Sequence, residues 1–131
     1  MQCVAADNFA TCPKDVLIVE DDPLLALDFE DRLLRLGVQS VRSAGTVATA
    51  LDLIAGRAPD FALLDVGLFS EKSFAVAERL TALKIPFAFV TGYGEDQVPA
   101  AFVDRPMLSK PYSQDALQAL LCRFCSPDRG V

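Results

Sequence analysis

The fold is decided by the stretch Phe61-Ala62-Leu63-Leu64-Asp65-Val66-Gly67-Leu68. A run of apolar residues ends there in a single carboxylate, at Asp65. This pattern is typical of a buried strand of a parallel sheet whose last residue emerges at the edge of the sheet. A carboxylate in that place can cap a helix, join a structural ion pair or stand at the mouth of a chemical site, and the rest of the chain decides among these roles.

Apolar, strand-like runs alternate with helical patterns on both sides of that stretch. The expected strands are 16–19, 38–43, 60–65, 86–90 and 106–109. The expected helices run from Pro23 to about Gly37, from Thr46 to about Gly56, over 70–83, over 95–105, and onward from Ser113. We expect the fourth of these helices to be short or irregular because Pro99 lies inside it. Five strand–helix repeats with short connections predict an α/β fold, a doubly wound five-stranded parallel sheet with helices on both faces.

Capping residues and apolar spacing support these helices. Asp22 with Pro23, Thr46 and Ser113 are the expected N-terminal caps, and Gly37 is expected to end the first helix. The residues expected to face inward are Ala26, Phe29, Leu33 and Leu36 in the first helix, Val47, Leu51 and Ile54 in the second, Phe74, Ala77 and Leu80 in the third, and Leu117, Leu120, Leu121 and Phe124 in the last.

Composition limits the possible functions. The chain has 131 residues, of which 52% are hydrophobic, which suits one packed domain. With a net charge of −6 and few clustered basic residues, we expect no direct contact with DNA. No stretch is long and apolar enough to span a membrane, and we see no signal peptide, so we expect a cytoplasmic protein without membrane insertion. The absence of histidine excludes Ser-His-Asp catalysis and His-ligated zinc.

The four cysteines include one pair with C-x-x-C spacing, Cys122 and Cys125. This spacing can mark a redox or zinc pair. The pair lies at the end of a helical pattern in a chain expected to be cytosolic, which favours reduced thiols without such a role.

The chain is expected to consist of an N-terminal extension (1–13), a single domain (14–125) and a C-terminal tail (126–131).

Polar residues follow four of the expected strands. Glu20, Asp21 and Asp22 follow the first, Asp65 the third, Thr91 the fourth and Lys110 the fifth. In an open parallel sheet, functional groups gather beyond the carboxyl ends of the strands, so these residues are expected to converge. Each of these residues alone has an ordinary structural explanation. Their occurrence together, each directly after a different strand, points to a functional site.

The chemistry of this set suits a cation and a phosphoryl group. Three acids that face one pocket repel one another unless a cation is present. Oxygen ligands with room for water suit Mg²⁺, which takes one or two carboxylates and a substrate phosphate. A carboxylate can attack phosphorus to form an aspartyl phosphate, while the Lys110 ammonium neutralises charge on the phosphoryl oxygens and the Thr91 hydroxyl binds the product.

The chain resembles the receiver domains of two-component response regulators. The matching pieces are Ile18-Val19-Glu20-Asp21-Asp22-Pro23, Leu63-Leu64-Asp65-Val66, Val90-Thr91-Gly92 and Lys110-Pro111-Tyr112. The resemblance implies a flavodoxin-like sheet with strand order 2-1-3-4-5. It also implies a signalling protein that assists its own phosphorylation and dephosphorylation and is not otherwise an enzyme.

The resemblance assigns roles to single residues. It implies Asp65 as phosphoacceptor, Thr91 as switch hydroxyl and Lys110 as the base that senses the phosphate. The implied ligands of Mg²⁺ are Glu20, Asp21, Asp65 and the backbone carbonyl of Gly67. Asp22 falls outside this set, and helix capping is its expected role.

Two positions depart from the family pattern. Leu68 is followed by Phe69 where proline is usual, and Met107 stands where an aromatic switch residue is usual. Both departures, together with the run from Pro86 to Gly94, resemble the stand-alone FAT-GUY regulators of alphaproteobacteria. That resemblance implies a histidine kinase of the HWE or HisKA2 type as phosphodonor and a setting in the stress response.

Two alternatives to a phosphoacceptor remain open. One is a pseudo-receiver that binds partners without phosphorylation, against which the intact set of site residues argues. The other is an aspartate-nucleophile phosphatase, which usually needs a second Asp two residues after the nucleophile, where this chain has Gly67.

Overall fold

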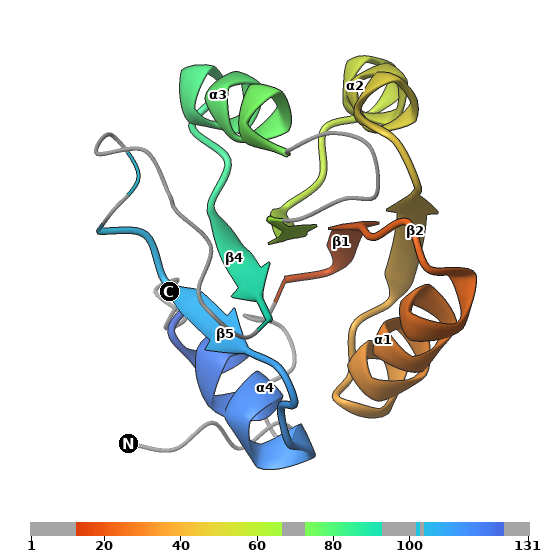
Figure 1. Cartoon of the computed structure of the whole chain (residues 1–131), viewed down its shortest axis with the longest axis vertical. Coiled ribbons are helices and arrows are strands. Elements are labelled where there is room, and N and C mark those ends of the chain that lie inside the picture. Colours follow the sequence, from red (N-terminus) through yellow and green to blue (C-terminus); the bar gives the residue numbers. More distant parts are fainter. Residues whose placement is uncertain (1–12, 67–72, 93–101, 103, 125–131) are drawn as a thin grey trace, which may run out of the picture.

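The computed structural model describes residues 13–66, 73–92, 102 and 104–124. Within them, five strands form one parallel sheet: β1 (Asp15–Val19), β2 (Ser40–Ala44), β3 (Phe61–Asp65), β4 (Phe87–Thr91) and β5 (Met107–Ser109). Four helices accompany it: α1 (Pro23–Arg35), α2 (Val47–Gly56), α3 (Phe74–Ala82) and α4 (Gln114–Cys122). The strand order is β2-β1-β3-β4-β5, so the predicted flavodoxin-like α/β fold is confirmed (Figure 1).

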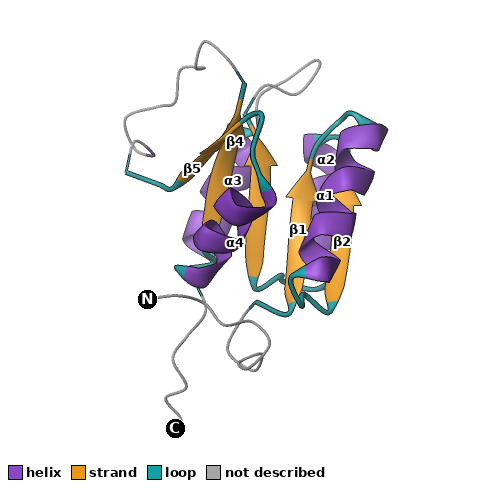
Figure 2. Cartoon of the chain, turned by 90° about the horizontal axis from the view of Figure 1, so that it is seen from below, coloured by secondary structure: helices purple, strands orange, loops and turns teal. Residues whose placement is uncertain are grey.

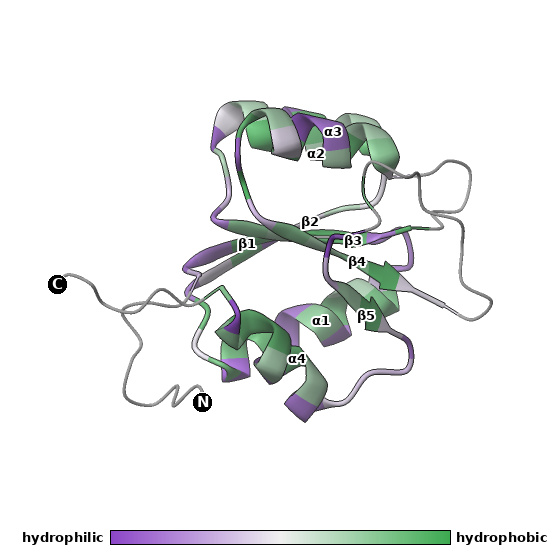
Figure 3. Ribbon diagram, turned by 90° about the vertical axis from the view of Figure 1, so that its left-hand side faces the viewer, coloured by the Kyte–Doolittle hydropathy of each residue, from purple (hydrophilic) through white to green (hydrophobic). Residues whose placement is uncertain are grey.

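The sheet lies between two helical layers. α2 and α3 cover one face, and α1 and α4 cover the other (Figure 3). Alternate residues of one strand therefore enter different cores. In β3, Ala62 and Leu64 pack towards α2 and α3, whereas Phe61 and Leu63 pack towards α1 and α4. All five residues of β3 and of β4 are buried, which explains their continuous apolar runs.

The parallel strands all point towards one edge of the sheet, so their carboxyl ends lie together (Figure 2). The three predicted N-caps are confirmed there. Asp22 accepts hydrogen bonds from the backbone N–H groups of Leu24 and Leu25, Thr46 from that of Thr49, and Ser113 from that of Ala116. Helices α1, α2 and α4 therefore begin where the sequence predicts.

The second strand begins later than predicted, at Ser40 instead of residue 38, and extends to Ala44. The cause is the way in which α1 ends. Gly37 has a φ of 101°, its N–H donates to the Leu34 carbonyl, and the Val38 N–H donates to the Leu33 carbonyl. This is a Schellman motif, which places Val38 in the helix cap, where its apolar side chain fills the core beside α1.

The inward faces of the helices agree with prediction at most positions. Ala26, Phe29, Leu33, Ile54, Ala77, Leu80, Leu117, Leu120 and Leu121 are buried as predicted, whereas Leu36, Val47, Leu51, Phe74 and Phe124 are only partly buried. Val76 and Ala50 are fully buried and were not predicted. In α3, Val76 takes the inward place predicted for Phe74, whose ring lies at the margin beside Phe89 and Phe102.

Several predictions fall on parts of the chain outside the described residues. These are the start of the third helix (70–72), most of the irregular fourth helix (95–105), and nearly all of the predicted N-terminal extension and C-terminal tail. Phe102, within the predicted fourth helix, is described and buried, with its ring against those of Phe87 and Phe89.

Candidate functional site

The acids predicted to converge do so. Glu20 and Asp21 follow β1, and Asp65 ends β3, the strand next to β1. One carboxylate oxygen from each of the three lies within 4.8 Å of the others. Glu20 and Asp65 are buried, whereas Asp21 is half-exposed. Three acids so close together favour a hard cation with oxygen ligands, so the donor set fits the predicted Mg²⁺.

Lys110 brings positive charge to the same place. Its ammonium nitrogen lies 3.2 Å from Asp65 Oδ2 and 3.5 Å from Glu20 Oε1. The Lys110 backbone N–H donates to the Thr91 carbonyl at 2.8 Å, which fixes the end of β5 to the end of β4. Thr91 is itself buried as the last residue of β4. The structure thus gathers the predicted residues Glu20, Asp21, Asp65, Thr91 and Lys110 at one edge, while Gly67 lies outside the described residues.

The electrostatics of this cluster favour a cation. Burial of the Glu20 carboxyl raises its pKa from 4.5 to about 7; the Asp22 N–H opposes this shift, and the nearby Asp65 charge adds to it. Burial lowers the pKa of the Lys110 ammonium, but attraction to Asp65 and Glu20 outweighs burial, and the pKa lies above its usual value. Lys110 therefore stays charged at neutral pH and compensates only part of the acidic charge.

The acidic turn is held by the start of α1. The Glu20 Oε2 atom accepts the Asp22 backbone N–H at 3.1 Å. The Asp22 side chain in turn accepts the Leu24 N–H at 2.9 Å as the helix cap. The predicted capping role of Asp22 is confirmed, and the same residue also orients the Glu20 carboxylate through its main chain.

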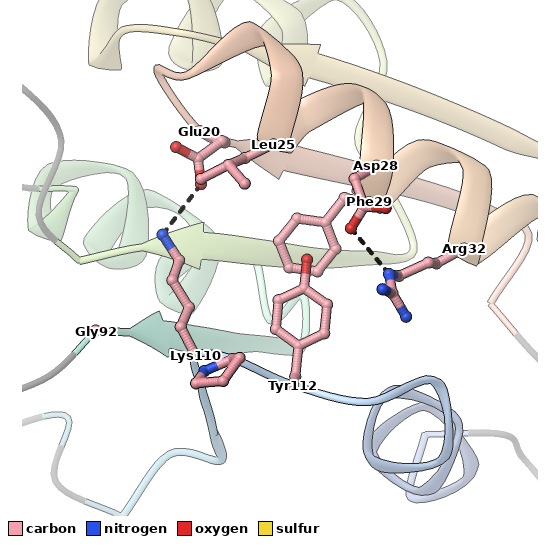
Figure 4. A pocket seen from close by; sticks show the side chains of 9 residues that line it. Glu20, Leu25, Asp28, Phe29, Arg32, Gly92, Lys110 and Tyr112 are labelled. Atoms are coloured by element: carbon pink, nitrogen blue, oxygen red, sulfur yellow. Dashed lines mark hydrogen bonds and ion pairs between the residues drawn. The ribbon is translucent and has the colours of Figure 1, made fainter.

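A pocket of about 490 Å³ opens beside the acids, between α1 and the residues that follow β5 (Figure 4). Its apolar wall is formed by Leu25, Phe29, Pro111 and Tyr112, and Glu20, Gly92 and Lys110 line its inner side. The Tyr112 and Phe29 rings stack with centroids 4.8 Å apart, and the Arg32 guanidinium lies 5.4 Å from the centre of the Tyr112 ring. Burial and the Asp28 charge raise the pKa of the Tyr112 hydroxyl to about 12, against the effect of Arg32, so it stays protonated.

Sequence reasoning missed the roles of Phe29 and Arg32 in lining this pocket, and of Gln114 as the partner of Arg32. Arg32 donates to the Gln114 side-chain oxygen at 3.3 Å, and the Gln114 amide donates to the Arg32 carbonyl at 3.1 Å. These bonds tie α1 to α4 across 82 residues of sequence. Phe29 was predicted as an ordinary core residue, and no local pattern signals its long-range partner.

Other predicted positions lie apart from the cluster or outside the described residues. Met107, in the place of the usual aromatic, is 43% exposed on the edge strand β5. Cys122 is half-buried as the last residue of α4, and its C-x-x-C partner Cys125 is outside the described residues, as is Phe69. Among the residues that the structure does describe, no helix has both the length and the apolar character needed to cross a bilayer.

Comparison with known proteins identifies the class. The family model of the response regulator receiver domain matches residues 16–121. The chain therefore belongs to the response regulator receiver domain family, a class of signalling modules, and the predicted family is confirmed. This membership, together with the acidic cluster at the strand ends, supports a phosphoacceptor role in two-component signalling.

Particular relatives refine this picture. The solution structure of SdrG from Sphingomonas melonis is similar to this chain, with 43% sequence identity and a TM-score of 0.75, over 86% of this chain and 95% of SdrG. The structure of a BeF3-activated conformation of SdrG also has a TM-score of 0.75. Such a match is in line with the predicted resemblance to a single-domain subgroup.

The curated relatives are longer. The sensory transduction protein LytT of Bacillus subtilis is 31% identical over 120 residues, which cover 88% of this chain and 50% of LytT. The phyllosphere-induced regulator PhyR of Methylorubrum extorquens is 30% identical over 115 residues, covering 81% of this chain and 43% of PhyR. The chain thus spans about half the length of the curated relatives that it matches.

Proposed function

We propose that this chain is a phosphoacceptor that takes a phosphoryl group from a histidine kinase onto Asp65, in a reaction that requires Mg²⁺. The observation that carries the proposal is the convergence of the Glu20, Asp21 and Asp65 carboxylates within 4.8 Å, with the Lys110 ammonium 3.2 Å from Asp65. In a receiver domain this arrangement supplies a nucleophile, a place for a cation and a counter-charge.

Each residue has a defined part in the proposed transfer. A carboxylate oxygen of Asp65 attacks phosphorus as the phosphorus–nitrogen bond to the donor's histidine breaks, and the imidazole leaves with the bonding electron pair and takes up a proton. Mg²⁺, when held by Glu20, Asp21, Asp65 and the Gly67 carbonyl, neutralises charge on the phosphoryl oxygens. Lys110 exchanges its contact with Asp65 for one with a phosphoryl oxygen, and the Thr91 hydroxyl donates to another.

The proposed output follows from the relatives. The likeness to SdrG, for which a BeF3-activated conformation is known, supports a phosphoryl-driven change in this chain. We propose that it signals through protein contacts or drains phosphate from its kinase, within a single domain over residues 14–125, in the cytoplasm. The likeness to the PhyR stress response regulator supports a role in stress signalling, with a kinase of the HWE or HisKA2 type as donor.

Mass spectrometry after incubation with Mg²⁺ and acetyl phosphate tests the central step. The expected result is one phosphoryl adduct, absent in Asp65→Asn and absent when the cation is chelated. Asp52→Asn, which removes an exposed carboxylate from α2, is the matched control and should keep the adduct. An adduct that persists in Asp65→Asn would contradict the proposal, and no adduct at any Mg²⁺ concentration would favour a phosphorylation-independent interaction domain.

A further inference from the structure

The pocket between α1 and the residues that follow β5 is continuous with the proposed phosphoryl site. Glu20, Gly92 and Lys110 line its inner side. The Lys110 ammonium also lies 3.2 Å from Asp65 Oδ2, so one side chain borders both the pocket and the proposed nucleophile. Gly92 directly follows Thr91, the last residue of β4. A group attached to the phosphorus of a donor at Asp65 can therefore extend into the pocket.

The middle of the pocket is apolar and roomy. Its wall is formed by four apolar or aromatic residues, Leu25, Phe29, Pro111 and Tyr112. The Phe29 and Tyr112 rings lie between the side chains of Lys110 and Arg32 (Figure 4). The pocket has a volume of about 490 Å³, whereas a cavity of about 150 Å³ already holds a benzene molecule. It therefore has room for an apolar group much larger than the methyl group of acetyl phosphate.

The two ends of the pocket differ in their need for a charged ligand. At the outer end, Arg32 Nε donates to Asp28 Oδ2 at 2.8 Å, and Arg32 Nη1 donates to the Gln114 side-chain oxygen at 3.3 Å. These polar groups satisfy one another within the protein. At the inner end, the Lys110 ammonium is placed to receive a phosphoryl oxygen. Because a second charge against the apolar wall would be costly, a suitable ligand carries its charge on the phosphoryl group and is apolar beyond it.

We propose that this protein also accepts phosphoryl groups from small acyl phosphates whose acyl group is apolar and of butyryl size or larger, and that this group lies in the pocket against Leu25, Phe29 and Tyr112. The inference rests on the proposed phosphoacceptor function and adds a substrate class to it. In the reaction, a carboxylate oxygen of Asp65 bonds to phosphorus as the phosphorus–oxygen bond to the acyl group breaks. The acid is released as a carboxylate that keeps the bonding electron pair, so no proton is transferred.

Burial of the acyl chain should make the larger donors react faster. Each buried methylene group favours transfer to an apolar site by a factor of about four. Butyryl phosphate has two more methylene groups than acetyl phosphate, and the two released acids are of similar acidity, so they are similar as leaving groups. Leu25 is 38% exposed, so the pocket wall shields the chain only in part. We therefore expect the second-order rate constant of adduct formation to be about tenfold higher with butyryl phosphate.

Initial rates of adduct formation on the full chain, measured by mass spectrometry in Mg²⁺ with each donor, test the proposal. Leu25→Ala should lower the butyryl-to-acetyl rate ratio about threefold, because the truncation removes part of the pocket wall. Leu27→Ala is the matched control and should keep the ratio. It is the same substitution on the same helix, at a side chain that is 59% exposed and does not line the pocket. Because each ratio compares two donors on one variant, changes in stability or in the phosphoryl site cancel.

The possible results separate this inference from the proposed function. Equal rates with the two donors in the wild type would overturn the inference and leave the phosphoacceptor function intact. An equal fall of the ratio in Leu25→Ala and Leu27→Ala would also overturn it, because the acyl chain would then lie on the outer surface of α1. No adduct from either donor would overturn the phosphoacceptor function and this inference with it. Asp65→Asn should form no adduct with either donor.

Discussion

The Lys110 ammonium lies 3.2 Å from Asp65 Oδ2, and this contact joins the last strand of the sheet to the central one. Lys110 also approaches Glu20 at 3.5 Å, so a single cation faces two buried carboxylates. In the absence of a metal ion, the ammonium is therefore the main counter-charge of the cluster.

Replacing Lys110 by Met should lower the free energy of unfolding at pH 8 in chelator by about 1–2 kcal/mol, because two buried acids lose their cation. This loss is smaller than the usual cost of breaking a buried ion pair because the Lys110 side chain is 27% exposed, and solvent screens its charge. Mg²⁺ should restore part of this loss, so it should stabilise the variant more than the wild type. Urea unfolding with and without Mg²⁺ measures both effects.

Lys14→Met is the control for this change, because it removes the same charge at the opposite end of the strands, next to the start of β1. Equal stability of Lys110→Met and wild type in chelator would show that the ammonium does not compensate the acids.

Glu20 should make the metal-free protein less stable as the pH rises. Its pKa is about 7 in the folded protein and 4.5 in its ordinary state, so between these values the folded chain holds more protons than the unfolded chain. The slope of unfolding free energy against pH is then negative, and Glu20 costs of the order of 1–3 kcal/mol once the pH exceeds 7. Glu20→Gln removes this dependence.

The difference in unfolding free energy between Glu20→Gln and wild type, measured in chelator, isolates this effect from other carboxylates. It should grow in favour of the variant as the pH rises from 4.5 to 7 and then level off. A difference that is constant with pH would mean that Glu20 titrates normally. With Mg²⁺ present the difference should shrink, because the cation favours the charged carboxylate.

Much of the fold could be predicted because its signals are local. The apolar run that ends at Asp65 identified a central buried strand, and caps such as Asp22 and Ser113 located the helix starts. The gathering of the site at one edge followed from the parallel order of the strands, since parallel strands bring their carboxyl ends together whatever their distance in sequence.

What could not be predicted depends on contacts between distant parts of the chain. Val38 reads as a strand residue, yet a helix-cap bond to Leu33 holds it in the turn. Phe74 and Val76 differ in burial because the phenyl rings of β4 and Phe102 occupy the space above the sheet, which favours the smaller Val76 inside. The stack of Phe29 on Tyr112 unites residues 83 positions apart and leaves no periodic trace in the sequence.

Asp22 should link helix stability to the geometry of the metal site. Its side chain caps α1, and its N–H holds Glu20 Oε2 at 3.1 Å. Asp22→Ala should lower the free energy of unfolding by about 1 kcal/mol and also weaken Mg²⁺ binding, because the turn that presents Glu20 and Asp21 loses its anchor. Asp22→Asn keeps an oxygen acceptor and should retain most of the stability. Urea unfolding and Mg²⁺ titration followed by NMR provide the two measurements, and an unchanged Mg²⁺ affinity in Asp22→Ala would refute the link.

Phe102 should be a major contributor to stability although it belongs to none of the four α-helices and five strands. Its ring is 5.7 Å from that of Phe89 and 6.1 Å from that of Phe87, measured between centroids, and the residue is 5% exposed. Phe102→Ala should cost about 3–4 kcal/mol through lost burial and a cavity, and Phe102→Leu clearly less. Urea unfolding of both variants measures the difference, and similar losses in the two would mean that the site collapses around the shorter side chain.

Met107 should tolerate an aromatic ring without a large change in stability. The side chain is 43% exposed on β5, while the next residue, Leu108, is buried in the core. Because Met107→Tyr adds a ring at an exposed edge, the unfolding free energy should stay within about 0.5 kcal/mol of wild type. The aromatic switch of related domains would make this position couple to Thr91. If residue 107 is not coupled to Thr91 in this protein, Met107→Tyr and wild type should form the phosphoryl adduct from acetyl phosphate at the same rate. A clear change in that rate would show that residue 107 is coupled to the site.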